Sequence, residues 1–287
     1  MCLLATPAPG WYDMGVNMTA FIHFLAQFEY ILTDYSNGVT AENGLFFGGA
    51  GGALGGTATL LGLGLLVVAS LIGAVVQARL KSVIEKYSAV ETRLTGAETA
   101  RRMLEQNGIH DVKVISVKGR LTDHYNPADK TVNLSETVYA CNSIAAMAVA
   151  AHECGHAVQH ATAYPWLGLR SSLVPVVNIG SRLGQLVLMA GLAMLAMGTG
   201  PTVAWIGLAL FAGTTVFALV TLPVEFNASA RALAWLERND AVNSALHDDA
   251  RTALRWAAMT YVAGALSSLA MLLYYAAIIL SRTSRRD

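Results

Sequence analysis

The chain has 287 residues, of which 54% are hydrophobic and 13% charged, whereas an average soluble domain has about 25% charged residues. These proportions exclude a disordered chain and argue against an ordinary soluble globule. The formal net charge is zero, with 19 basic and 19 acidic side chains, so we expect no nucleic-acid partner. The 3 cysteines are too few for a disulfide framework or a zinc site made of cysteines.

The first 54 residues contain acidic but no basic side chains, so they lack the basic start of a signal peptide. We predict that this extension lies outside the cytoplasm. Gly48, Gly52 and Gly56 would lie on one side of a helix, which suits close packing between spans and a homo-oligomer formed through them. A flexible glycine linker explains the same residues. No Gly-Lys-Ser/Thr follows, which excludes a phosphate-binding loop.

Four stretches are long and apolar enough to cross a membrane, the second being short enough to be a buried core helix instead. We therefore predict a mainly α, multi-pass membrane protein with about four transmembrane helices and a small α+β domain. The expected organisation is an N-terminal extension (1–54), a first transmembrane helix (55–78), a soluble domain (79–182), a transmembrane hairpin (183–222), a helical segment (223–258), and a last transmembrane helix with a basic tail (259–287).

The basic residues predict the orientation in the membrane. All Lys and Arg residues except Arg282, Arg285 and Arg286 lie between Arg79 and Arg255, in the segments after the first and third spans. The positive-inside rule makes the side that carries these two segments cytoplasmic. The basic tail would then lie on the other side.

The soluble segment carries signals for helices and strands. Thr95 and Glu98 form a capping-box pattern that begins a helix, and residues 111–117 and 131–134 are typical of short strands. Between them, residues 123–125 are either an edge strand that could pair with an extended peptide or a hydrogen-bonded turn. A long helix begins near Asn142 or Ser143.

That helix contains His152-Glu153-Cys154-Gly155-His156, which is an H-E-x-x-H pattern. One helical turn places both imidazoles on the same face, where they can bind one Zn²⁺ ion. Glu153 flanks this face, close enough to act as a general base. The alternative is a pair of unrelated surface histidines.

A catalytic zinc site takes three protein ligands. Glu225 is the best third candidate, because two spans separate it from His156 and return it to the same side of the membrane, where a charge needs a partner. Alternatively, Glu225 is a carboxylate at a helix N-terminus, where it interacts with the helix dipole. His160 is too far along the helix to share the metal with His152, and Cys154 points away. The other histidine candidates are His110, His124 and His247.

The segments HECGHAVQ, TGAETARRMLEQNGIHDVKV, LTDHYNP and LPVEFNASARAL together resemble the YugP-like family of neutral zinc metallopeptidases of bacterial membranes. The resemblance covers roughly residues 60 to 280. It implies a zinc-dependent endopeptidase in the bacterial cytoplasmic membrane with its active site facing the cytoplasm. It also implies that His152 and His156 are zinc ligands, that Glu153 is the base and that Glu225 is the third ligand.

The layout also resembles a larger group of integral-membrane H-E-x-x-H peptidases. These often have an Asp four residues after the Glu ligand, where this chain has Ser229. The hydrogen-bond partner of the ligand histidines therefore stays open, with Asn227 or an Asp of the soluble domain as candidates. The candidate oxyanion donors are His124, Tyr125, Tyr139 and Arg231. For Arg231 and Arg238, a basic rim facing lipid headgroups is the stronger interpretation.

The sequence thus favours a membrane zinc peptidase whose partners are the lipid bilayer and a protein or peptide substrate. A non-catalytic membrane protein with a structural or regulatory zinc site is the alternative. A metal sensor or transporter is a weaker one, because the spans carry almost no charge for an ion path.

Overall fold

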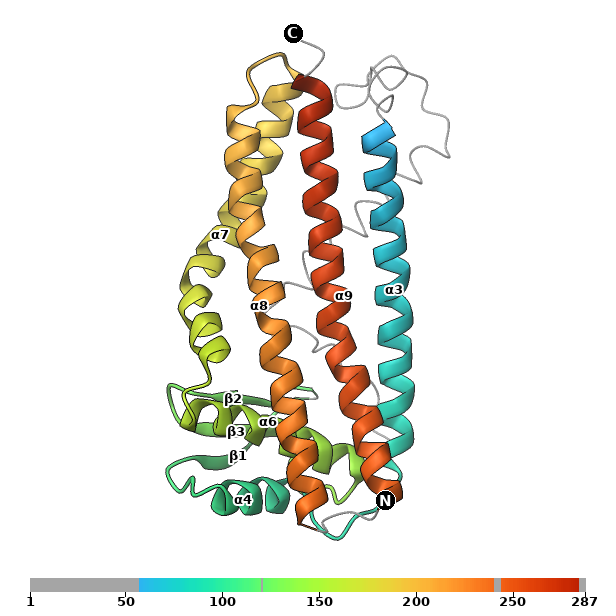
Figure 1. The fold of residues 1–287 in the computed structure, drawn as a ribbon, viewed down its shortest axis with the longest axis vertical. Coiled ribbons are helices and arrows are strands. Elements are labelled where there is room, and N and C mark those ends of the chain that lie inside the picture. Colours follow the sequence, from blue (N-terminus) through green and yellow to red (C-terminus); the bar gives the residue numbers. More distant parts are fainter. Residues whose placement is uncertain (1–56, 120, 240–243, 284–287) are drawn as a thin grey trace. The chain divides into compact units, whose positions relative to one another are not determined.

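The computed structural model describes residues 57–119, 121–239 and 244–283 (Figure 1). The expected N-terminal extension, including Gly48, Gly52 and Gly56, lies outside them. The elements in chain order are α3 (Thr57–Ser88), α4 (Gly96–Gln106), β1 (Lys113–Val117), β2 (His124–Asn126), β3 (Thr131–Ser135), α5 (Glu136–Ala140), α6 (Ile144–Ala161), α7 (Pro165–Ala196), α8 (Thr202–Arg238) and α9 (Ser244–Thr283).

The chain is a mainly α-helical, multi-pass membrane protein with a small sheet. Among the described residues, three stretches are long and apolar enough to cross a bilayer, namely Leu60–Ser88, Thr202–Arg238 and Ala245–Thr283. The helix α7 consists of two parts, Pro165–Asn178 and Leu183–Ala196, which meet at a bend of 50°. If these two parts are counted together as one bent span, α7 is the fourth. Pro175 lies inside α7, where its missing N–H weakens the helix just before the bend.

The four long helices extend beyond the spans that the sequence indicates, and α3 continues to Ser88 rather than residue 78 while α9 begins at Ser244 rather than residue 259. The stretch expected to span from residue 183 belongs to α7, which begins already at Pro165. The third span was expected to end at residue 222, but α8 continues through Pro223 to Arg238. Glu225 therefore lies inside a continuous helix, and the alternative that placed it at a helix N-terminus is wrong. Proline interrupts one backbone hydrogen bond, which a helix packed on its neighbours tolerates.

The described chain divides into two compact units. The first unit contains residues 73–172 and 219–263, and the second contains residues 57–72, 173–218 and 264–283. Several helices contribute one part to each unit.

In the first unit, a three-stranded sheet contacts the helices α4 and α6 (Figure 1). The strand order is β1-β3-β2, with β1 parallel and β2 antiparallel to β3. The expected capping box at Thr95 and Glu98 begins α4, and the Ser143 hydroxyl accepts a hydrogen bond from the Ala146 N–H at the start of α6. Leu134, Ile144, Met147 and other fully buried side chains form its core. Residues 124–126 form an edge strand rather than a simple turn.

In the second unit, α7 and α8 form a helical hairpin in which their backbones touch (Figure 1). A Cβ atom added to Gly191 would lie 2.3 Å from the Ala204 nitrogen, and one added to Gly207 would lie 2.3 Å from the Leu188 nitrogen. Glycine is therefore required at both crossings, as is common between membrane helices. A hydrogen bond of 2.7 Å between the Thr215 and Ser268 hydroxyls joins α8 to α9.

Candidate metal centre

The centre lies in the first unit, where α6 packs directly on α8. A Cβ atom on Gly155 would lie 2.5 Å from the Ala228 carbonyl oxygen, so only glycine lets the two backbones approach so closely. This contact brings the helical turn that carries His152 and His156 against the turn of α8 that carries Glu225.

Two imidazoles and one carboxylate converge at this crossing. His152 Nε2 lies 3.2 Å and His156 Nε2 lies 3.6 Å from Glu225 Oε2, and Glu225 is 2% exposed. Zinc ligands at 2.0–2.1 Å in tetrahedral geometry stand about 3.3 Å from one another, so these spacings fit a zinc ion. Among the described residues, His152, His156 and Glu225 form a group whose ligand atoms all lie within 4.8 Å of one another, close enough to hold one metal ion. The donor set suits zinc, and it leaves a fourth position open.

Glu153 is placed to act as a general base beside this cluster. Its carboxylate is buried, and Oε2 accepts a hydrogen bond of 3.0 Å from the Tyr125 backbone N–H on β2. Burial raises the pKa of Glu153 to about 7, although His152 and the Tyr125 N–H act in the opposite direction. A carboxylate with a pKa near neutrality can accept a proton and return it at physiological pH.

The strand that contacts Glu153 is anchored by Asp123. The Ser135 N–H donates to one Asp123 oxygen at 2.7 Å and the Ser135 hydroxyl donates to the other at 3.1 Å. Burial raises the pKa of Asp123, and the hydrogen bonds from Ser135 partly offset this effect. Tyr125 is held from its other end, where its hydroxyl lies 2.7 Å from His160 Nδ1.

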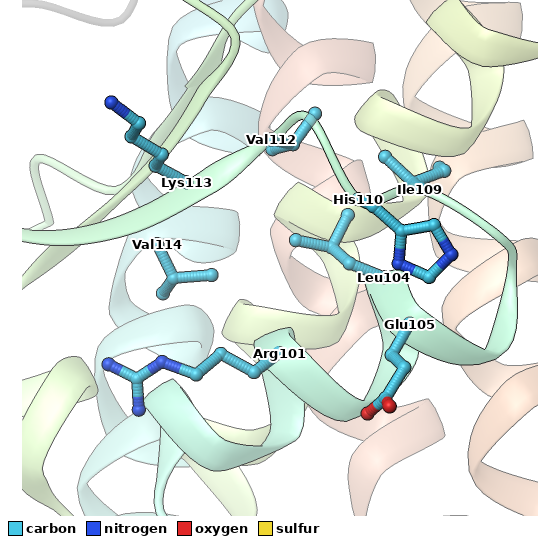
Figure 2. Close-up of a pocket in the computed structure, with 8 residues that line it drawn as sticks. All are labelled: Arg101, Leu104, Glu105, Ile109, His110, Val112, Lys113 and Val114. Carbon is cyan, nitrogen blue, oxygen red and sulfur yellow. The ribbon is translucent and has the colours of Figure 1, made fainter.

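The other histidines lie away from this cluster. His124 Nδ1 is 2.8 Å from the Thr122 carbonyl, and His247 Nε2 is 3.2 Å from the Leu233 carbonyl. His110 lines a cavity of about 390 Å³ between α4 and β1, which no residue of the cluster lines (Figure 2). His160 lies outside the cluster, in agreement with a spacing too long for it to share the metal with His152, and its Nδ1 contacts the Tyr125 hydroxyl. Cys154 points to the Ala100 carbonyl, and burial raises the pKa of its thiol.

Both histidines of the cluster have a neutral hydrogen-bond partner on Nδ1. Ser229 Oγ lies 3.1 Å from His152 Nδ1, and Gln159 Oε1 lies 3.0 Å from His156 Nδ1. Asn227, which the sequence suggested as a partner, contacts Gln159 rather than a histidine. Gln159 was missed, although its position three residues after His156 on the same helix is the signal that could have found it.

The candidate oxyanion donors have different surroundings. The Tyr139 hydroxyl accepts a hydrogen bond from Arg101, and Arg231 Nε donates to Asn227. The Tyr261 side chain on α9 is hydrogen-bonded to Glu225. Sequence reasoning missed Tyr261, because a tyrosine in an uncharged span carries no local signal.

Residues 63–280 match the family described as "putative neutral zinc metallopeptidase". The chain belongs to this family. The match includes His152, Glu153, His156 and Glu225. A curated relative from Bacillus subtilis (strain 168), described as "Putative membrane protease YugP", is 44% identical over 207 residues, which cover 71% of this chain and 90% of that relative. No solved structure matches the chain significantly.

Proposed function

We propose that this chain is a membrane-bound zinc metalloendopeptidase that hydrolyses peptide bonds of membrane or membrane-proximal proteins. The observation that carries the proposal is the convergence of His152, His156 and Glu225 with the carboxylate of Glu153 beside them. The family supports the same chemistry, and the printed name of the Bacillus relative describes a membrane protease.

His152, His156 and Glu225 would hold the zinc ion, which supplies Lewis-acid polarisation of the peptide carbonyl and lowers the pKa of water. Glu153 accepts the proton of the attacking water and passes it to the departing amine. The Tyr125 N–H holds Glu153 Oε2 in place for both transfers. Because this N–H donates to Glu153, the edge of β2 away from β3 faces the base, and we expect an extended substrate peptide to pair with other backbone groups of that edge.

We place the active site on the cytoplasmic side of the bacterial cytoplasmic membrane. The support is the distribution of basic residues, which are concentrated in the segments after the first and third spans. A homo-oligomer formed through the glycine-rich first span is a further part of the proposal, and it rests on the sequence spacing alone.

A structural or regulatory zinc site is the competing function. Structural zinc sites are usually closed by four protein ligands. The cluster found among the described residues offers three, and a buried carboxylate stands beside it, which favours catalysis over a structural role.

A digest of casein or a peptide library by purified protein tests the proposal. Wild type should cleave, a chelator should stop cleavage, and zinc should restore it. Glu153→Gln should lose activity by at least about 100-fold while it still binds zinc, because the general base alone is removed. Cleavage by the zinc-loaded Glu153→Gln protein would contradict this mechanism. Zinc bound by wild type without any cleavage would favour the structural role.

A further inference from the structure

Gln159 is a fully buried amide on α6 whose hydrogen-bond partners all lie near the metal centre. Its Nε2 donates to the Val224 carbonyl at 2.7 Å and to Asn227 Oδ1 at 3.1 Å. Its Oε1 lies 3.0 Å from His156 Nδ1. Every polar atom of this side chain is therefore engaged, and the amide connects α6 to the turn of α8 that carries Glu225.

The orientation of this amide follows from groups that can act in one way only. A backbone carbonyl accepts and never donates, so the Val224 oxygen requires the NH₂ group of Gln159 on its side. Arg231 Nε donates and never accepts, so Asn227 presents its oxygen at 2.8 Å, and this oxygen also receives the NH₂ group of Gln159. Both contacts turn the Gln159 oxygen toward His156.

The orientation of Gln159 then determines which ring nitrogen of His156 carries a proton. An amide oxygen accepts, so His156 Nδ1 must carry a hydrogen in order to donate to it. The neutral ring then has its lone pair on Nε2, the nitrogen that faces Glu225 Oε2 at 3.6 Å. Two acceptors that face each other in a buried place need a proton or a metal ion between them, and a metal ion can fill this role.

His152 has a different partner. The Ser229 hydroxyl at His152 Nδ1 can either donate or accept, so it is compatible with both tautomers of that ring. Of the two histidines, His156 is thus the one whose tautomer is imposed by obligate donors and acceptors of the surrounding chain.

We propose that Gln159 is a positioning residue that selects the Nδ1–H form of His156 and so makes Nε2 of this ring its metal-binding atom. Val224 and Arg231 act through Gln159, because they fix the orientation of its amide. The inference rests on the proposed metal centre, but it concerns the state of a ring that can be measured without metal and without substrate.

The first measurement is ¹⁵N NMR of histidine-labelled wild type, with the His156 signals assigned by their loss in His156→Ala. At a pH where the His156 ring is neutral, we expect a protonated Nδ1 and an unprotonated Nε2 in the metal-free protein, and a protonated Nδ1 in the zinc-loaded protein. An unprotonated Nδ1 in the metal-free protein would overturn the proposal. If wild type binds no zinc, the proposed function fails, whereas this measurement still decides the role of Gln159.

The second measurement is the zinc affinity of two variants, determined by competition with a chelator. Gln159→Met removes the acceptor of His156 Nδ1 and should weaken zinc binding about 10- to 100-fold. Gln159→Glu keeps an acceptor for His156 Nδ1, and its second oxygen, protonated in this buried place, can donate to the Val224 carbonyl as the NH₂ group does, so its zinc affinity should stay within a few-fold of wild type. Equal losses in both variants, or no loss in Gln159→Met, would overturn the proposal, because a side chain that merely packs would not distinguish them.

Gln106→Met is the matched control. It removes a glutamine of the same unit that accepts a hydrogen bond of 2.7 Å from Trp235 Nε1 and has no contact with the cluster. Its zinc affinity should equal that of wild type. If Gln159→Met fails to fold, Gln159→Glu and the state of His156 in wild type still test the proposal, since a loss of affinity in Gln159→Glu contradicts it.

Discussion

At the scale of single residues, a bound cation should change the pKa of Glu153, on which several neighbouring groups act in opposite directions. Burial, together with the charge of the neighbouring Glu225, raises the pKa of this carboxyl to about 7 in the metal-free protein, while His152 and the Tyr125 N–H act in the opposite direction. A zinc ion held by His152, His156 and Glu225 would place a positive charge beside Glu153, and a positive charge favours the ionised carboxylate. Zinc binding should therefore release the proton that Glu153 holds below neutral pH.

This release predicts a pH dependence of zinc affinity. Below a pH of about 7, zinc must displace the proton of Glu153, so affinity should rise with pH through neutrality by up to about tenfold per pH unit from this group. Deprotonation of the two histidines adds a dependence of its own. In Glu153→Gln, the pH dependence that comes from the histidines should remain, and the pH dependence that comes from residue 153 should be lost. Chelator competition from pH 5.5 to 8.5 measures both proteins, and identical curves would contradict the assigned pKa.

Sequence reasoning predicted some residues of the centre and missed others for physical reasons. His152, Glu153 and His156 lie within two turns of one helix, where spacing alone predicts a shared face. Glu225 was predicted because a carboxylate at a membrane boundary needs a partner. Tyr261 belongs to another helix, and its approach to Glu225 depends on how α8 and α9 pack. Ser229 offered no charge that would distinguish it from a packing residue.

At the scale of secondary-structure elements, the crossing of α6 and α8 depends on one glycine. An alanine at Gly155 would place its Cβ 2.5 Å from the Ala228 carbonyl oxygen, which belongs to backbone and cannot rotate away. Gly155→Ala should therefore separate the helices, destabilise the protein by about 1–3 kcal/mol and lower its zinc content. Thermal unfolding and metal analysis of the purified variant measure the two effects.

Gly168→Ala is the control for this prediction. Gly168 lies in α7, and an added Cβ would meet no atom within 4 Å. This variant should keep its zinc and gain up to about 1 kcal/mol of stability, because alanine favours the helix. If Gly155→Ala binds zinc and unfolds as wild type does, the close crossing is not needed for the centre.

The hairpin of α7 and α8 depends on glycine in the same way. Gly207→Leu would force a side chain into the Leu188 backbone, whereas an added Cβ at Gly213, in the same helix, would meet nothing within 4 Å. We expect Gly207→Leu to lower the unfolding temperature in detergent by several degrees and Gly213→Leu to leave it nearly unchanged. Equal behaviour of the two variants would show that the hairpin tolerates a wider separation.

The boundaries of elements were less predictable than their existence. The capping box at Thr95 and the N-cap at Ser143 predicted two helix starts correctly, because capping is a local interaction. The length of α8 was not predicted, since Pro223 and Glu225 are typical of a span that ends. Beyond Pro223, the helix packs closely on α6, as at Gly155 and Ala228. The sequence left residues 123–125 open between an edge strand and a turn, because the choice depends on pairing with β3.

At the scale of the whole molecule, the number of crossings decides which side of the membrane each segment faces. In the part of the chain that the structure describes, three stretches have the length and hydropathy of a span, and the bent α7 decides whether this part crosses three or four times. The proposed orientation needs α7 to cross, because residues 79–164 and residues 223–258 must share the cytoplasmic side.

Alkaline phosphatase fusions test this topology, since the enzyme is active only outside the cytoplasm. A fusion after Asn107 should be inactive. A fusion after Gly200, between α7 and α8, should be active if α7 crosses the membrane. A cytoplasmic reporter fused at the same two positions should give the opposite pattern. Activity of the phosphatase at Asn107, or its absence at Gly200 with a stable fusion protein, would contradict the proposed orientation.

The central claim is that the residues at the crossing of α6 and α8 bind zinc, and metal content tests it most directly. Zinc per chain should be measured in wild type, in Glu225→Ala and in Glu237→Ala, which removes an exposed carboxylate from the same helix. We expect about one zinc ion per chain in wild type and in Glu237→Ala, and a sharp loss in Glu225→Ala. Undiminished zinc in Glu225→Ala, or none in wild type after purification without chelators and reloading, would contradict this claim.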